Sequence, residues 1–170
     1  MDTSSRTELF LELSSALCGV AIDSFRPASG SSPTIFPKLG DLMPRNTPID
    51  RMTEFLETLD QNVGSETVNE LLTSFSHLQK QGSPTLAAES LLGTESSAGI
   101  CRSIMKMWFL GIWYSPADPF TPHHVISTQA YKESLIWKVM QSHPMGYSVW
   151  SHGYWSDEPP KITEFLTLSD

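Results

Sequence analysis

The segment from Ile100 to Trp155 reads ICRSIMKMWFLGIWYSPADPFTPHHVISTQAYKESLIWKVMQSHPMGYSVWSHGYW. It contains all five tryptophans and all four tyrosines of the 170-residue chain. Aromatic side chains bury large apolar areas, and the indole and phenol groups add a polar handle, so this concentration is typical of a core or of a protein interface. We expect the segment to be partly core and partly a surface for another protein, with the preceding residues mainly supporting it.

The first part of this segment predicts a central helix over residues 98–113. Its apolar side chains lie on nearly all sides of the helix, which is typical of an element surrounded by others. These side chains are Ile100, Ile104, Met105, Met107, Trp108, Phe109, Leu110 and Ile112. Methionines beside tryptophans also occur in haem and flavin pockets, but at helical spacing they more often form a core.

Apolar residues recur at helical spacing in other parts of the chain. This pattern predicts further helices, at residues 4–21, 48–60, 65–81 and 128–140. Residues 84–92 are compatible with a short helix, whereas residues 114–127 contain three prolines and predict a loop. No stretch shows the alternation of a strand of any length. The sequence therefore predicts an all-α fold, a single-domain bundle of about five helices spanning residues 1–170.

Two stretches fall outside this helical pattern. Residues 23–46 are rich in Pro and Ser and predict a surface loop. Residues 141–170 predict an irregular segment, and ordering its Trp and Tyr rings costs conformational entropy unless they pack on the helices or on another protein. We expect this segment to be a partner-docking tail. Rigid aromatic side chains dominate the binding energy of many interfaces, and the expected anchors are Trp113, Tyr114, Trp150, Tyr154 and Trp155.

Charge and cysteine content bear on several classes of function. The formal net charge is −8 and the eleven basic residues are scattered, which argues against nucleic-acid binding because phosphates attract clustered Lys and Arg. No apolar run approaches the roughly 18 residues of a membrane span. Cys18 and Cys101 form no CxxC pair, so buried free thiols are favoured, while a disulfide between the two remains open.

Motifs of catalysis are sparse in this sequence. It contains no GxGxxG, GxxxxGK or GxSxG pattern. One cluster carries residue types that bind transition metals, namely Asp118, His123, His124, His143 and His152. An independent metal-dependent enzyme is therefore one alternative, although such histidines more often hydrogen-bond loop backbone. An unrelated helical adaptor is a second alternative.

Four short blocks resemble a known family. Residues 10–19 (FLELSSALCG) resemble its FLxLSxxLTG signature, and residues 107–112 (MWFLGI) are similar to its AWYLG segment. Residues 130–135 (AYKESL) are similar to its Y-x-x-A-L-x-W/F block, and residues 153–159 (GYWSDEP) resemble its closing G-x-W-x-x-x-P element. The blocks occur in the family's order. They resemble the small subunit of bacterial FAD-dependent sugar and polyol dehydrogenases.

The resemblance implies a non-catalytic small, or gamma, subunit that is not an enzyme by itself and holds no cofactor. It implies a large partner, an FAD flavoprotein of the glucose-methanol-choline oxidoreductase type, whose maturation the small subunit supports in a chaperone-like way. A multi-haem cytochrome c subunit often completes such complexes. Because no twin-arginine segment precedes the first block, we expect a cytoplasmic protein as encoded, or a periplasmic complex if a leader has been removed.

Overall fold

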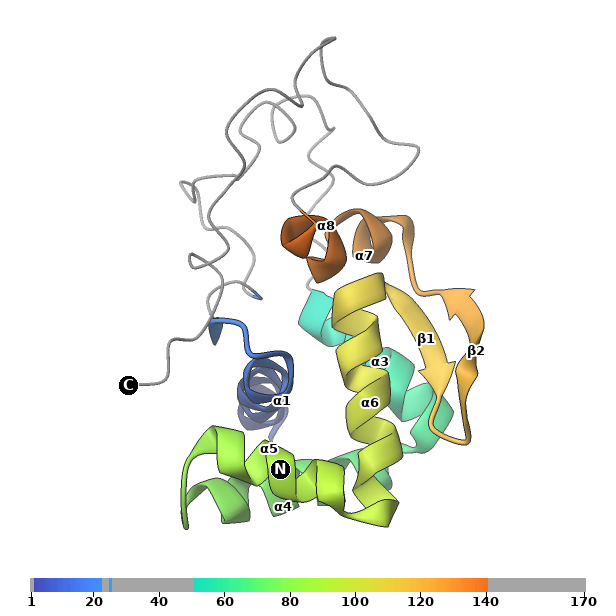
Figure 1. Cartoon of the computed structure of the whole chain (residues 1–170). Helices are drawn as coiled ribbons and strands as arrows, with labels where there is room; N and C mark the ends of the chain where they lie inside the picture. Colours follow the sequence, from blue (N-terminus) through green and yellow to red (C-terminus); the bar gives the residue numbers. More distant parts are fainter. Residues whose placement is uncertain (1, 23–24, 26–50, 141–170) are drawn as a thin grey trace, which may run out of the picture.

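The computed structural model describes residues 2–22, 25 and 51–140. Its central element is the helix α6 (Glu95–Leu110), which contacts α1, α5, a two-stranded hairpin, α7 and α8 (Figure 1). Thr94, in an extended conformation, precedes this helix, and Glu95 lies in its first turn, where a carboxylate is favourable. The predicted central helix over residues 98–113 is thus confirmed, with both ends shifted by three residues toward the N-terminus.

The C-terminal end of α6 is set by a glycine. Gly111 adopts φ 68° and ψ 21°, the left-handed conformation, and its N–H donates to the Met107 carbonyl at 2.9 Å. Glycine adopts this conformation without a steric cost, which is why helices often end at one. The helix therefore stops before Ile112 and Trp113, and these two residues enter a strand.

Four further helices pack around α6 and one another. They are α1 (Thr3–Cys18), α3 (Arg51–Val63), α4 (Ser65–Gln79) and α5 (Pro84–Gly93). The N-cap of α1 is Asp2, whose carboxylate accepts the Ser5 N–H at 2.7 Å. The short helix α5 begins with Ser83 as N-cap and Pro84 in its first turn, which suits proline because that position lacks an intrahelical N–H bond.

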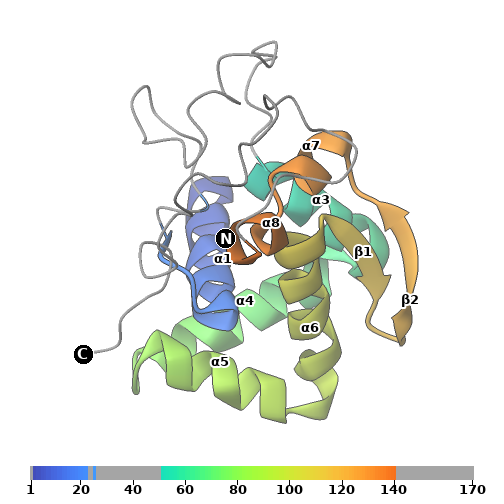
Figure 2. The same cartoon turned by 45° about the horizontal axis from the view of Figure 1, so that its top comes forward.

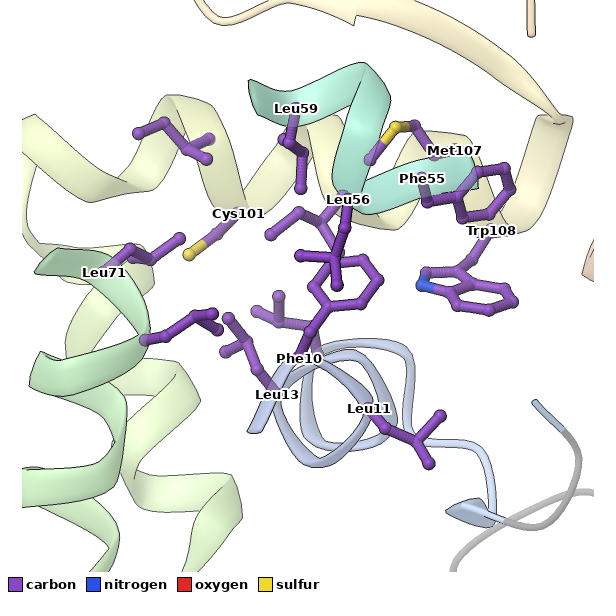
Figure 3. Close-up of a cluster of buried hydrophobic side chains, with 14 of the residues drawn as sticks. Phe10, Leu11, Leu13, Phe55, Leu56, Leu59, Leu71, Cys101, Met107 and Trp108 are labelled. Atoms are coloured by element: carbon purple, nitrogen blue, oxygen red, sulfur yellow. The ribbon is translucent and has the colours of Figure 1, made fainter. Parts of the chain in front are cut away.

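The core lies where α1, α3, α4 and α6 face one another (Figure 3). Phe10 from α1 and Phe55 from α3 approach the Trp108 indole of α6, with ring centroids 6.4 and 4.7 Å away. Phe25 closes the same indole from another side at 4.5 Å, edge to face. Completely or almost completely buried side chains fill the rest of this core: Leu11, Leu13, Leu59, Val68, Leu72, Phe75, Cys101, Ile104 and Met107.

The predicted loop over residues 114–127 is replaced largely by an antiparallel hairpin, which the sequence did not reveal. Strand β1 (Ile112–Ser115) pairs with β2 (Asp118–Val125) in a two-stranded sheet. Trp113 lies opposite His124 and Tyr114 opposite Pro122, with register shifts on both sides of Tyr114. In both views the hairpin stands on the side of α6 away from α1 (Figure 1, Figure 2). The prolines are tolerated because this small sheet has only edge strands.

The predicted helix over residues 128–140 is broken in the middle. It forms α7 (Thr128–Lys132) and α8 (Leu135–Val139), separated by Glu133 and Ser134. Ser134 adopts the extended conformation, with φ −61° and ψ 146°. The Trp137 indole N–H donates to the Tyr131 carbonyl at 2.8 Å and so bridges the break.

The described residues are mostly helical, and the two-stranded sheet is a minor addition, so the all-α prediction is confirmed. Two expectations lie outside these residues, apart from Phe25: the Pro/Ser-rich loop at 23–46 and the irregular tail at 141–170. The first three residues of the helix predicted at 48–60 also lie outside them. In the described ranges, no helix combines the length and the apolar character needed to cross a membrane.

We predict that Gly111→Ala lowers the free energy of unfolding by more than about 2 kcal/mol. A left-handed backbone costs a residue with a Cβ about 1–2 kcal/mol, and this Cβ would also lie 2.6 Å from the Ala130 carbonyl group and the Tyr131 nitrogen. Gly19→Ala is the matched control, because Gly19 has φ 65° with nothing within 4 Å of the added Cβ, and it should lose only about 1 kcal/mol. Urea unfolding of both variants measures the difference, and equal losses would contradict the close packing.

Candidate functional site

The hairpin is clamped to one side of α6 by polar contacts and by a close approach. Gly99, Ser103 and Lys106 lie at i, i+4 and i+7 on the helix and so share a side. The Ser103 hydroxyl donates to the Tyr114 carbonyl at 2.7 Å. The Lys106 ammonium donates to the Pro119 carbonyl and lies 4.3 Å from the centre of the Tyr114 ring, within reach of a cation–π interaction.

Glycine at position 99 allows the tip of the hairpin to reach α6. A Cβ built on Gly99 would lie 3.1 Å from the Pro116 Cβ and 3.2 Å from its carbonyl oxygen. At the other end of the hairpin, the Ile126 N–H donates to the Gly111 carbonyl at 3.0 Å. The hairpin is therefore fixed at its tip, along its length and at its base.

Strand β2 presents apolar and imidazole side chains to solvent. Phe120 is 91% exposed and Val125 is 51% exposed. His123 and His124 are also exposed. We call these four residues the β2 surface. Phe120 is the most exposed large apolar side chain in the described part of the chain, and we take it as the candidate contact for another protein.

Within residues 2–22, 25 and 51–140, two other places carry exposed large apolar side chains. Val139 and Met140 lie at the C-terminal end of α8, and Leu86 lies on α5. Single exposed apolar residues are common on protein surfaces and need no functional explanation.

Charge is unevenly distributed between the two halves of the described chain. Among the described residues between 2 and 93, three basic side chains stand against nine carboxylates: Asp2, Glu8, Glu12, Glu54, Glu57, Asp60, Glu66, Glu70 and Glu89. From α6 to Met140, four basic side chains (Arg102, Lys106, Lys132 and Lys138) stand against three carboxylates (Glu95, Asp118 and Glu133). The β2 surface thus belongs to the part of the protein that is not acidic.

Two of the five expected interface anchors, Trp113 and Tyr114, lie in the described part of the chain. Trp113 is only 2% exposed and belongs to the core, so it is not free to contact another protein in this conformation. Tyr114, a residue of strand β1, is half-buried, and its ring lies against the Lys106 ammonium group. Trp150, Tyr154 and Trp155 lie outside the described residues.

Sequence reasoning missed Phe120 as a candidate interface residue. A signal was present, because Phe120 lies between Pro119 and Pro122, where neither a helix nor a regular ladder would bury it. The predicted loop at residues 114–127 and the choice of Trp and Tyr as the expected anchors leave Phe120 out.

The candidate metal ligands do not gather in the described part of the chain. There, no group of three or more His, Cys, Asp or Glu side chains is placed to hold a metal ion, while His143 and His152 lie outside it. The Asp118 carboxylate instead accepts the N–H groups of Phe120 at 3.4 Å and of Thr121 at 3.3 Å. A hydrogen bond from the Thr121 side chain is the largest cause that lowers the pKa of Asp118, and the two backbone N–H groups lower it further. Asp118 thereby shapes the turn into β2.

A group of partly buried charges connects α3 with α7 and α8. Arg51 forms an ion pair with Glu133. Burial lowers the pKa of Lys138, and the positive charge of Arg51 lowers it further. The Oε2 atom of Glu54 is buried and accepts no hydrogen bond from any described residue. The Arg51–Glu133 ion pair thus links α3 to the segment between α7 and α8.

A polar hollow on α4 does not enclose a ligand site. Its lining comes from one face of a single helix and consists of Glu66, Asn69, Glu70, Thr73 and Ser74. The hollow is open to solvent, whereas small-molecule sites are concave and largely apolar.

Both cysteines are free. Burial raises the pKa of Cys18 and of Cys101 to about 12. Reactive cysteines have a lowered pKa, because the thiolate is the nucleophile. The two thiols are therefore structural, as the sequence favoured, and the open alternative of a disulfide between them was wrong.

None of the protein-family models matches the chain, and searches of curated proteins and of solved structures give no match either.

We predict that Ser103→Ala lowers the free energy of unfolding by about 1–2 kcal/mol, because the partly buried Tyr114 carbonyl loses this donor. Ser74→Ala, at an exposed position of α4, is the matched control and should change stability by less than about 0.5 kcal/mol. Urea unfolding measures stability, and amide hydrogen exchange should show faster exchange in β1 and β2 of Ser103→Ala only. An unchanged hairpin in that variant would contradict the clamp.

We predict that the buried thiols destabilise the protein at alkaline pH. The pKa of Cys101 is about 12 in the folded chain against an ordinary 9.0, so the stability is present below pH 9 and is lost as pH rises toward 12. At pH 10.5 the loss from this thiol is about 2 kcal/mol. Cys101→Ala should be about 1 kcal/mol less stable than wild type at pH 8 and about 1 kcal/mol more stable than wild type at pH 10.5, because only wild type loses about 2 kcal/mol there.

Ile100→Val provides the control for this measurement, because it removes core volume without a titratable group. Its stability difference from wild type should be the same at both pH values. If Cys101→Ala also shows a constant difference in urea unfolding, the thiol does not titrate as described.

Proposed function

We propose that this chain is a non-catalytic, partner-binding subunit, and that its partner is an FAD-dependent sugar or polyol dehydrogenase of the glucose-methanol-choline type. The observation that carries the binding role is Phe120, 91% exposed on a hairpin that α6 holds in place. The identity of the partner comes from the four sequence blocks that resemble the small subunit of such enzymes.

A fixed aromatic side chain is suited to binding a protein. Association costs the conformational freedom of the side chains and loops that become ordered, so a surface ordered in advance binds more tightly. The hairpin is ordered by contacts to Gly99, Ser103 and Lys106 and needs no partner for that. Phe, like Tyr and Trp, is enriched in the cores of protein interfaces.

The arrangement of the sequence blocks supports the resemblance. Phe10 of the first block stacks on Trp108 of the second, with ring centroids 6.4 Å apart. Gly111 of the second block lies so close to Ala130 of the third that no Cβ fits between them. Three of the four blocks therefore meet in one part of the fold, as expected if they are features of one structural family rather than separate coincidences.

In this proposal the chemistry belongs to the partner. FAD would be bound by the large subunit, a multi-haem cytochrome c subunit would accept electrons from it in some complexes, and this chain would support maturation of the flavoprotein. Tyr114, Trp150, Tyr154 and Trp155 remain proposed contacts to the large subunit, whereas Trp113 serves the core.

We predict that the full chain, tagged and co-expressed with a flavoprotein encoded beside it, co-purifies with that flavoprotein in a one-to-one complex showing flavin absorbance. The flavoprotein expressed without this chain is the control and should be recovered with less bound FAD. Trp155→Ala should weaken the complex by about 2 kcal/mol if that indole is an anchor. Sugar or polyol oxidation by the isolated chain, or recovery without any flavoprotein, would contradict the proposal.

A further inference from the structure

We propose that Ser134 is a hinge, at which the short helices α7 and α8 join into one continuous helix over residues 128–140 in a second conformation of the chain. The change is a rotation about the Cα–C bond of Ser134. It would move α8 and turn the chain after Met140 in a new direction. We call the observed arrangement the broken form and the second one the joined helix. The inference does not depend on the proposed function.

The backbone of the broken form differs from a helix mainly in one dihedral angle. Ser134 has φ −61°, which is already helical, and only its ψ of 146° is extended. Glu133, before it, has φ −101° and ψ 9°, in the region that borders the helical one. A rotation of the Ser134 ψ to about −42° would therefore continue α7 into α8.

The sequence of the segment favours the joined helix. Ser127 caps α7 by accepting the Ala130 N–H at 3.0 Å, and no Pro or Gly follows it as far as Met140. Two helices of five residues each are marginal by themselves, because few of their N–H groups have partners within the helix. One longer helix would form more of these bonds.

The Ser134 side chain also fits the joined helix better than the broken form. Ser134 is 3% exposed, and its hydroxyl forms no hydrogen bond with any described residue. Although Ser134 is the N-cap of α8, its side chain caps no N–H. Inside a helix, a serine hydroxyl donates to the carbonyl three or four residues earlier, here that of Tyr131 or Ala130. The joined helix would thus satisfy a buried polar group.

Contacts to other elements make α7 the fixed side of the hinge. Ala130 packs so closely on Gly111 that no Cβ fits between them. Glu133 forms its ion pair with Arg51 of α3, and Glu133 precedes the rotating bond. Both contacts therefore stay in place while α8 moves. Figure 2 shows the two short helices as separate elements, and each contacts α6.

Trp137 holds α8 in the broken form. Its indole N–H donates to the Tyr131 carbonyl at 2.8 Å, and the two rings meet edge to face with centroids 5.4 Å apart. In a continuous helix, side chains three or four positions apart are neighbours, so residues six positions apart would lose both contacts. Leu135, which is 4% exposed, would also leave its present position.

Lys138 acts against Trp137 and Leu135. Burial lowers the pKa of Lys138, and the positive charge of Arg51 lowers it further. The ammonium group is thus less favourable on α8 in the broken form than it would be in water. The two conformations are therefore balanced, since apolar and aromatic contacts favour the broken form while Lys138 and the Ser134 hydroxyl oppose it.

The hinge is tested by NMR on the full chain, with wild type and Trp137→Leu. The Cα chemical shift of Ser134 reports its ψ, and it should move from an extended value in wild type to a helical value in the variant. The amide hydrogens of Leu135 and Ile136 should exchange at least about tenfold more slowly in the variant, because the joined helix supplies acceptors for them.

Two further variants control this experiment. Trp137→Phe keeps an aromatic ring and removes only the indole N–H, so Ser134 should shift in the same direction by less, and this variant keeps the test valid if Trp137→Leu does not fold. Ile136→Leu is the matched control, because position 136 takes part in neither contact between Trp137 and Tyr131. Its Ser134 should stay extended.

Two results would overturn the hinge. One is a Ser134 Cα shift that stays extended in every folded Trp137 variant. The other is random-coil shifts with fast amide exchange from Leu135 to Val139, which would mean that α8 unfolds when it is released. Neither result bears on whether the chain binds a flavoprotein, so the inference and the proposed function fail separately.

Discussion

Helix α6 has to satisfy two different environments on neighbouring faces, and the rest of the structure depends on this requirement. One face carries Ile100, Ile104 and Met107 into the core against α1 and α3. The other carries Gly99, Ser103 and Lys106, which hold the hairpin. The first face stabilises the fold through apolar burial and dispersion. The second face holds the hairpin through the close backbone approach at Gly99 and through hydrogen bonds. A helix with apolar residues on both faces would bury the hairpin as a core element.

The left-handed glycine at the end of α6 connects these two environments. Gly111 turns the chain directly into β1, and its missing side chain admits the backbone of α7 at Ala130. The Ile126 N–H then bonds back to the Gly111 carbonyl, so the chain leaves and returns to the same residue. The intervening residues are thereby closed into a loop with fixed ends, and the clamp from Ser103 and Lys106 has only a short hairpin to hold.

The sequence predicted what depends on local periodicity and missed what depends on distant contacts. The apolar spacing from Ile100 to Leu110 marks a buried helix whatever surrounds it, and the same holds for α1, α4 and α5. Strand β2 shows no alternation because nearly all its side chains are exposed, and its order comes from α6. The break at Ser134 has no Pro or Gly to announce it. Trp113 looked like an anchor because composition cannot tell which side of a strand faces the core.

The way in which the hairpin is held explains why it has apolar side chains left over. A strand that attaches by burying its apolar residues has none available for a second protein. Here the attachment uses Gly99, the Ser103 hydroxyl, the Lys106 ammonium group and backbone carbonyls of the hairpin. The buried Trp113 of the neighbouring strand β1 contributes as well. Phe120 and Val125 are therefore spared, although water exposure of a Phe side chain forgoes about 1.5–3 kcal/mol of burial. A binding partner that covers Phe120 would recover this free energy without rebuilding the hairpin, which supports a docking role for β2.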